Sequence, residues 1–130
     1  MNKENSQIRK THKISEHDFS TQVFDLLNIY QWRWCHIRPA FTNKGYRTPI
    51  QGHDPDGFKG KGLPDIIAIR PPRLLFIELK DQYAKPSPEQ EAWLNDLKRC
   101  NLLQGIDTDM IEVYLWRPDQ LEVEILEVLK

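Results

Sequence analysis

The sequence lacks the features that would place it in a membrane or in a disulfide-stabilised class. No apolar run approaches the length needed to span a bilayer. The N-terminal segment MNKENSQIRKTHK has no hydrophobic stretch of the kind that signal peptides contain. Only two cysteines are present, Cys35 and Cys100, which are too few and too plainly spaced for a disulfide framework or a zinc site. We therefore expect an intracellular protein without a membrane partner.

A strong excess of one charge is also missing, since the net charge is −1. The charges are unevenly distributed, however. Residues 1–62 hold 10 Lys or Arg against 6 Asp or Glu, whereas residues 63–130 hold 8 against 13. A basic front and an acidic end could steer a polyanion to one face of the protein. Two ordinary solvated surfaces would give the same composition.

A chain of 130 residues is long enough to bury the core of one domain. Residues 1–13 are polar and aperiodic, which predicts a loose tail, and residues 14–130 are expected to form a single domain. Ser15 can cap a helix whose apolar residues recur at helical spacing: Phe19, Val23, Leu26, Leu27 and Tyr30. Glu16 lies on the same stripe, where it suits the helix dipole but could also point toward the rim of the core.

The middle of the chain predicts strands. Residues 32–39 alternate well enough for one strand, and the Gly and Pro content of residues 39–62 predicts a long loop. Two apolar runs, Ile66–Arg70 and Arg73–Ile77, predict two further strands joined across Pro71-Pro72.

A second helix is predicted to begin with Ser87 as cap, Pro88 at the first helical position and Gln90 completing a capping box. Residues 109–118 predict a fourth strand. Residues 118–130 favour a final helix, although their alternation also allows a strand. The order α-β-β-β-α-β-α predicts an α/β or α+β domain with a central mixed sheet flanked by helices.

Charged residues stand at the open end of the predicted hairpin. Facing residues of an antiparallel pair with a symmetric loop have sequence numbers with a constant sum, and a turn centred on Pro71-Pro72 then pairs Asp65 with Glu78. Their Cβ atoms would lie about 5 Å apart on one face of the sheet. Lys80 projects from the same face as Glu78 because side chains alternate with period two. A slip of one residue would separate the acids.

Two facing carboxylates destabilise a sheet unless a positive charge lies between them. Lys80 could serve, which would make the group a structural ion-pair network. A divalent cation could serve instead, because Mg²⁺ takes oxygen ligands and commonly uses one or two carboxylates together with substrate phosphate. Such an arrangement suits phosphodiester hydrolysis. The residues alone support both interpretations equally.

The segments GKGLPDIIAI, LFIELKD and SPEQEAWLNDLKRCN resemble the VRR-NUC (virus-type replication-repair nuclease) branch of the PD-(D/E)xK nucleases. The resemblance extends from about residue 16 to residue 116 and implies a restriction-endonuclease-like core. It implies that Asp65, Glu78 and the Leu79 carbonyl bind Mg²⁺ or Mn²⁺, and that Glu16 contacts the ion directly or through water.

The resemblance also implies that Lys80 is the catalytic lysine and that Gln90 is the active-site glutamine of the second helix. The implied activity is a metal-dependent DNA endonuclease acting on branched DNA such as four-way junctions, often as a homodimer, in the cytoplasm of a bacterium or a phage-infected cell. The basic residues that we expect to contact DNA are Arg38, Arg47, Lys59 and Lys61, of which the two lysines could equally be solvated loop residues.

Other interpretations stay open at this point. A catalytically idle nucleic-acid-binding module would keep the fold without the chemistry. A restriction-type endonuclease or an exonuclease would keep the chemistry with another substrate. An interaction protein could use its acidic C-terminal part to bind a basic partner. His53, Asp54 and Asp56 could be taken for a second metal site, which we regard as the less favoured interpretation of that loop.

Overall fold

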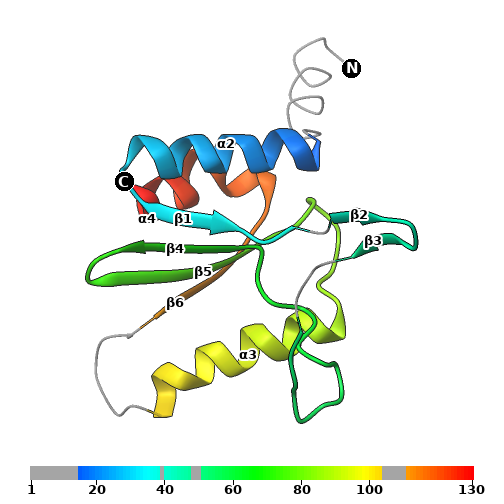
Figure 1. The fold of residues 1–130 in the computed structure, drawn as a ribbon. Coiled ribbons are helices and arrows are strands. Elements are labelled where there is room, and N and C mark those ends of the chain that lie inside the picture. The colour runs from blue at the N-terminus through cyan, green and yellow to red at the C-terminus, as the bar shows by residue number, and fades with distance from the viewer. Residues whose placement is uncertain (1–14, 39, 48–50, 104–110) are drawn as a thin grey trace, which may run out of the picture.

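A computed structural model describes residues 15–38, 40–47, 51–103 and 111–130, so the expected tail at residues 1–13 lies outside the described residues. The chain has an α+β fold in which helices flank a four-stranded mixed sheet (Figure 1). The elements are α2 (Glu16–Ile29), β1 (Arg33–His36), β2 (Ala40–Thr42), β3 (Gly45–Arg47), β4 (Ile66–Arg70), β5 (Arg73–Leu79), α3 (Pro88–Leu103), β6 (Glu112–Trp116), a 3-10 turn (Pro118–Gln120), a π-helical turn (Leu121–Ile125) and α4 (Leu126–Leu129). The predicted fold class is confirmed.

The sheet has the strand order β1-β4-β5-β6, and only the β5–β6 pair is parallel. Within the β4–β5 hairpin, Ile66 pairs with Ile77 and Arg70 pairs with Arg73, which confirms the predicted register. The turn is closed by a cis peptide bond between Pro71 and Pro72, the geometry of a type VI turn. One step beyond Ile66 and Ile77 stand Asp65 and Glu78.

Helix α2 begins as its sequence predicts. The Ser15 hydroxyl accepts a hydrogen bond from the Asp18 N–H at 3.0 Å. The predicted apolar stripe faces inward, and α2 and α4 cover one face of the sheet while α3 lies on the other (Figure 1). The core on the α2 side is made by Phe19, Val23, Leu27, Trp32, Ile66, Ala68, Leu75, Ile77, Leu79, Trp116, Ile125 and Leu129.

The prediction of one long loop over residues 39–62 was wrong in its first part. Strands β2 and β3 form a separate two-stranded sheet there, which projects away from the main sheet (Figure 1). Gly45, with φ at +93°, supplies the left-handed backbone that lets the chain reverse. The first strand ends at His36 rather than near Pro39, whereas the helix favoured for the C-terminal residues is confirmed over residues 118–129.

The two arginines at the closed end of the β4–β5 hairpin form hydrogen bonds that hold the fold together. Arg70 donates hydrogen bonds to the carbonyls of Tyr30 and Leu129 at 2.8 and 3.2 Å. Arg73 donates to Glu112 at 2.7 and 2.8 Å. Both guanidinium groups also lie over the Trp32 ring, 4.4 and 5.0 Å from its centroid. These arginines therefore fasten the C-terminal helix to the sheet.

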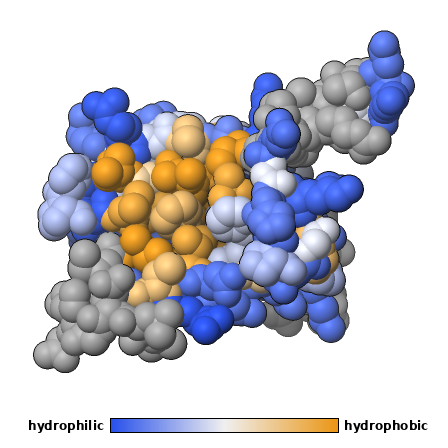
Figure 2. Space-filling view, turned by 60° about the horizontal axis from the view of Figure 1, so that its bottom comes forward, coloured by the Kyte–Doolittle hydropathy of each residue, from blue (hydrophilic) through white to orange (hydrophobic). Residues whose placement is uncertain are grey.

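Helix α3 packs against β6 and leaves part of its side of the sheet uncovered. On that side Ile69 is 37% exposed, and Ile67, Leu74 and Phe76 are half-buried. Figure 2, which brings the lower side of Figure 1 forward, shows hydrophobic residues gathered at the surface there. Within the described residues, we find no helix that combines the length and the apolar character needed to cross a membrane.

Candidate active site

Asp65 and Glu78 occupy the open end of the β4–β5 hairpin. Asp65 is half-buried, and its carboxylate accepts a hydrogen bond from the Leu79 N–H at 2.9 Å. Its carbonyl accepts the Ile37 N–H at 2.7 Å, which continues the pairing of β1 with β4 by one step. Backbone hydrogen bonds from both neighbouring strands therefore hold Asp65 in place.

Glu78 is 1% exposed, the one charged residue in the described core. Its Oε1 atom accepts a hydrogen bond from Gln90 Nε2 at 2.9 Å and lies 3.7 Å from Lys80 Nζ. Its Oε2 atom is buried, and no hydrogen bond to it is formed by the residues that the structure describes. A buried carboxylate oxygen without a partner costs free energy, so it marks a position where a cation would be bound favourably.

The electrostatics of the pair follow from burial and proximity. Burial, and then repulsion from Asp65, raises the pKa of Glu78 to about 8, although Lys80 opposes this shift. Burial also raises the pKa of Asp65, against the Leu79 N–H and the charge of His36. Two carboxyl groups in this position hold a proton between them near neutral pH unless a cation replaces it.

Gln90 connects this site to helix α3. The side-chain amide oxygen of Gln90 accepts a hydrogen bond from the Ser87 backbone N–H at 2.9 Å. The Gln90 backbone N–H donates to the Ser87 hydroxyl at 3.2 Å. This is the predicted capping box, and its amide nitrogen is left to bind Glu78. One side chain therefore both starts the helix and orients the buried carboxylate.

Lys80 and Leu79 are positioned by the strands on either side of β5. The Lys80 N–H donates to the Trp116 carbonyl of β6 at 3.0 Å, and the Lys80 side chain is 19% exposed at the rim of the site. The Leu79 N–H points toward Asp65. In extended backbone the carbonyl of a residue points to the same side as its N–H, so the Leu79 carbonyl is also directed toward Asp65.

Glu16 does not join these residues. It is exposed in the first turn of α2, a position that suits the helix dipole, and its contact with a metal ion directly or through water stays a prediction. Among the residues that the structure describes, no three His, Cys, Asp or Glu side chains are close enough to hold a metal ion together. The described site is thus a pair of carboxylates with a backbone carbonyl, which suits a Mg²⁺ or Mn²⁺ ion that keeps several waters and binds substrate phosphate.

The loop of residues 51–62 is fastened to the start of α3. Gly62 has φ at +94°, and a Cβ atom added to it would lie 2.4 Å from the Glu89 carbonyl carbon. Asp54 turns inward and accepts the N–H groups of Phe58 and Gly60 at 2.7 and 3.2 Å. Both of its oxygens are used within the loop, so Asp54 organises the loop.

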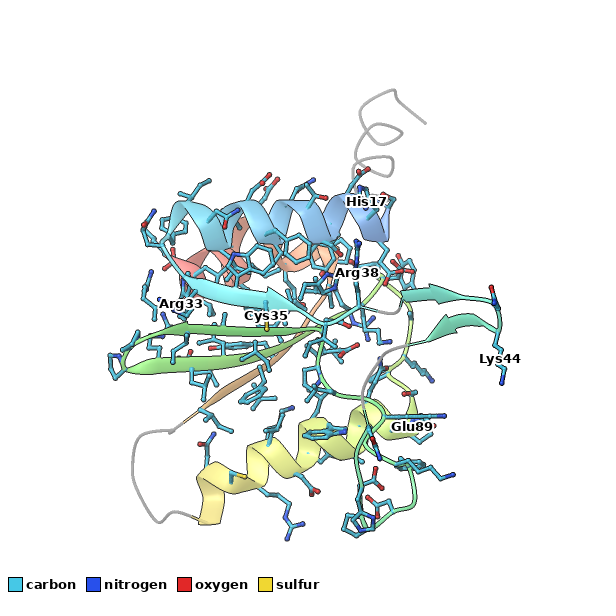
Figure 3. The ribbon with its side chains drawn as sticks, viewed as in Figure 1. His17, Arg33, Cys35, Arg38, Lys44 and Glu89 are labelled. Carbon is cyan, nitrogen blue, oxygen red and sulfur yellow. The ribbon has the colours of Figure 1, made fainter. Side chains whose placement is uncertain are left out.

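The four basic residues expected to contact DNA lie on different segments. Lys59 and Lys61 are exposed on the fastened loop, and Arg38 is exposed just after β1. Arg47 belongs to β3, but its side chain lies outside the described residues. Figure 3 shows Arg38 and Lys44 at the end of the molecule where β1 ends, with Arg33 at the opposite end of the sheet.

Sequence reasoning missed His36. Its ring lies 5.0 Å from the Phe24 ring, and it is near enough to Asp65 for their charges to interact. Burial lowers the pKa of His36, although Asp65 favours its charged form. The contact depends on the pairing of β1 with β4, so nothing near His36 in the sequence indicates it.

We compared the chain with protein-family models, with curated proteins and with solved structures, and none of them matches it. The case for function therefore rests on the residues and geometry of the site.

Proposed function

We propose that the protein is a deoxyribonuclease that uses Mg²⁺ or Mn²⁺ to hydrolyse phosphodiester bonds, as the resemblance to VRR-NUC nucleases implies. The observation that carries this proposal is the buried Glu78 Oε2 atom beside Asp65 at the open end of the hairpin, to which no residue in the described part of the chain donates a hydrogen bond. A divalent cation at that atom would offset both its burial and the repulsion between Glu78 and Asp65.

In this proposal Asp65, Glu78 and the Leu79 carbonyl hold the ion. A bound Mg²⁺ or Mn²⁺ would polarise the phosphodiester and lower the pKa of a water molecule. Gln90 holds Oε1 of Glu78 by a hydrogen bond, which leaves Oε2 for the ion. The Leu79 N–H holds Oδ2 of Asp65 in the same way, by a hydrogen bond.

Lys80 supplies the positive charge that the reaction needs outside the metal site. Its ammonium group lies at the rim, 3.7 Å from Glu78 Oε1, so it can reach a phosphate held beside the pair. There it would stabilise the negative charge that develops on the phosphate oxygens or orient the attacking water. Water adds to phosphorus, the bond from phosphorus to the leaving oxygen breaks, and that oxygen takes up a proton.

The distribution of charge supports DNA as the substrate. Residues 26–53 contain no Asp or Glu, and their basic residues are Arg33, Arg38, Lys44 and Arg47. Three of these four follow β1, at the end of the sheet that carries Asp65, and two belong to the projecting β2–β3 hairpin and its turn. A two-stranded ribbon of this kind has the dimensions that the major groove of DNA admits.

The test uses purified protein with a labelled four-way junction, a linear duplex and a single strand, each with Mg²⁺, Mn²⁺ or EDTA. Asp65→Asn and Lys80→Ala should each lower metal-dependent cleavage at least about a hundredfold. Asp25→Asn and Lys98→Ala are the matched controls, because these exposed residues lie on α2 and α3 away from the site.

Three outcomes separate the alternatives. Metal-dependent nicking that survives both site substitutions would overturn the assignment of the site. Binding without cleavage of any substrate would favour an idle nucleic-acid-binding module. Neither binding nor cleavage would favour an interaction protein. The implied homodimer is checked on the same preparation by sedimentation velocity.

A further inference from the structure

The loop between β5 and α3 presents a tyrosine to solvent. Tyr83 is 92% exposed, more than any other large hydrophobic residue in the described part of the chain. The next is Val123 at 68%. Tyrosine pairs a flat apolar ring with a polar tip, and full exposure leaves both faces of that ring without a protein neighbour.

The backbone that carries Tyr83 is nevertheless held firmly. The Arg117 guanidinium donates hydrogen bonds to the carbonyls of Asp81 and Ala84, both at 2.6 Å. On the other side of the turn, Gln82 Oε1 accepts the Asp119 N–H at 3.1 Å. The residues on both sides of Tyr83 are therefore anchored to the segment after β6, while its ring is directed outward.

This position lies close to the candidate active site. Tyr83 follows Lys80 by three residues, so their Cα atoms are at most about 11 Å apart. A strand whose phosphate lies at Lys80 therefore brings a base within reach of the ring.

The chemistry of the ring itself favours a base over a phosphate as the contact. Asp81 and Asp119 are exposed and border the loop, as do Lys85 and Arg117, so the surface around the ring carries both signs of charge. A nucleobase is uncharged, and base–aromatic stacking needs only a flat ring that is free on one face. In intact duplex the bases are already stacked on one another, so an unpaired base is the natural occupant.

We propose that Tyr83 is a stacking platform for an unpaired base next to the scissile phosphate, which directs the enzyme to DNA with an unpaired nucleotide at a gap, branch or single-stranded end. This inference rests on the proposed nuclease function. It makes Tyr83 a residue that determines substrate preference, separate from the residues that hold the metal.

The test uses one DNA sequence as a fully paired duplex and as a gapped duplex carrying 2-aminopurine in the gap. In the Lys80→Ala background, binding of the gapped DNA should quench 2-aminopurine fluorescence, and adding Tyr83→Ala should abolish the quenching. In the otherwise wild-type protein, Tyr83→Ala should lower cleavage of the gapped duplex about tenfold and change that of the paired duplex less than twofold.

Two conservative variants separate stacking from a general apolar contact. Tyr83→Phe keeps the ring and should retain quenching and cleavage, whereas Tyr83→Leu keeps apolar bulk without a ring and should lose both. Ile29→Ala, at a site that is 63% exposed on α2, should behave as the wild type.

Wild-type quenching and cleavage by Tyr83→Ala, or by Tyr83→Leu, would overturn this inference alone. Failure of the wild-type protein to bind or cut any of the DNAs would overturn the proposed function and this inference together.

Discussion

Glu78→Gln is expected to stabilise the metal-free protein at neutral and alkaline pH. The Glu78 side chain is 1% exposed. Burial and repulsion from Asp65 raise its pKa from 4.5 to about 8. A raised pKa means that the folded state binds this proton more tightly than the unfolded chain does. The carboxyl group therefore costs no stability below about pH 4.5, and the cost is complete once the pH exceeds about 8.

The size of the effect follows from the shift. Each pKa unit corresponds to 1.36 kcal/mol, so the shift of Glu78 sets an upper limit of about 5 kcal/mol on the loss between these two pH values. The raised pKa of Asp65 acts in the same direction. Since domains of this kind are stable by about 5–15 kcal/mol, the loss would be a large part of the total.

Urea unfolding in EDTA at pH 5, 6, 7 and 8 measures this directly. The free energy of unfolding of the wild type should fall across the series, while that of Glu78→Gln should fall much less. The glutamine amide can still accept the Gln90 hydrogen bond, and its NH₂ group can donate toward Asp65. Glu91→Gln, at an exposed position of α3, is the matched control and should follow the wild type.

Metal should reverse the loss. If Mg²⁺ or Mn²⁺ replaces the proton at the pair, adding either ion at pH 8 should raise the stability of the wild type but not of Glu78→Gln, and binding at pH 7 should release protons. Parallel pH dependences for the wild type and Glu78→Gln, or a wild-type stability that rises from pH 5 to 8, would refute the reasoning.

Three further predictions concern the surroundings of the site. Gly62→Ala should lower the free energy of unfolding by about 2–5 kcal/mol because its Cβ would meet α3 at 2.4 Å. Gly57 has φ at +84°, and a Cβ atom added to it would meet nothing within 4 Å. In the same urea titration Gly57→Ala should therefore cost only about 1–2 kcal/mol. Gln90→Ala should destabilise by about 2 kcal/mol and slow cleavage, and an unchanged rate would contradict its positioning role. Arg38→Ala should reduce the salt dependence of DNA affinity by about one phosphate contact, whereas Arg33→Ala, at the other end of the sheet, should not.

The parts of the fold that depend on neighbours in sequence were predictable. The helix cap at Ser15, the capping box at Ser87 and the register across Pro71-Pro72 are local features, and all three are confirmed. The β2–β3 hairpin was missed because strands of three residues are too short to show a periodicity. Its one local signal is Gly45, two residues after Asn43 in a turn.

The candidate site divides in the same way. The position of Asp65 opposite Glu78 could be predicted because it follows from the hairpin register, which one short turn determines. The exposure of Glu16, the nearness of His36 to Asp65 and the close approach of Gly62 to α3 depend on how separate elements pack. No local pattern encodes these distances.

The sequence by itself determined which residues stand at the open end of the hairpin and which face of the sheet they share, because side chains alternate along a strand and a turn centred on Pro71-Pro72 sets the pairing. Tertiary structure decided the burial and the pKa of their carboxyl groups. The elements packed around Glu78, among them α3 through Gln90 and β6 beside its backbone, bury the carboxylate, and this burial together with repulsion from Asp65 raises its pKa to about 8. Burial depends on every element that surrounds a group, so it cannot be read from the residues beside it.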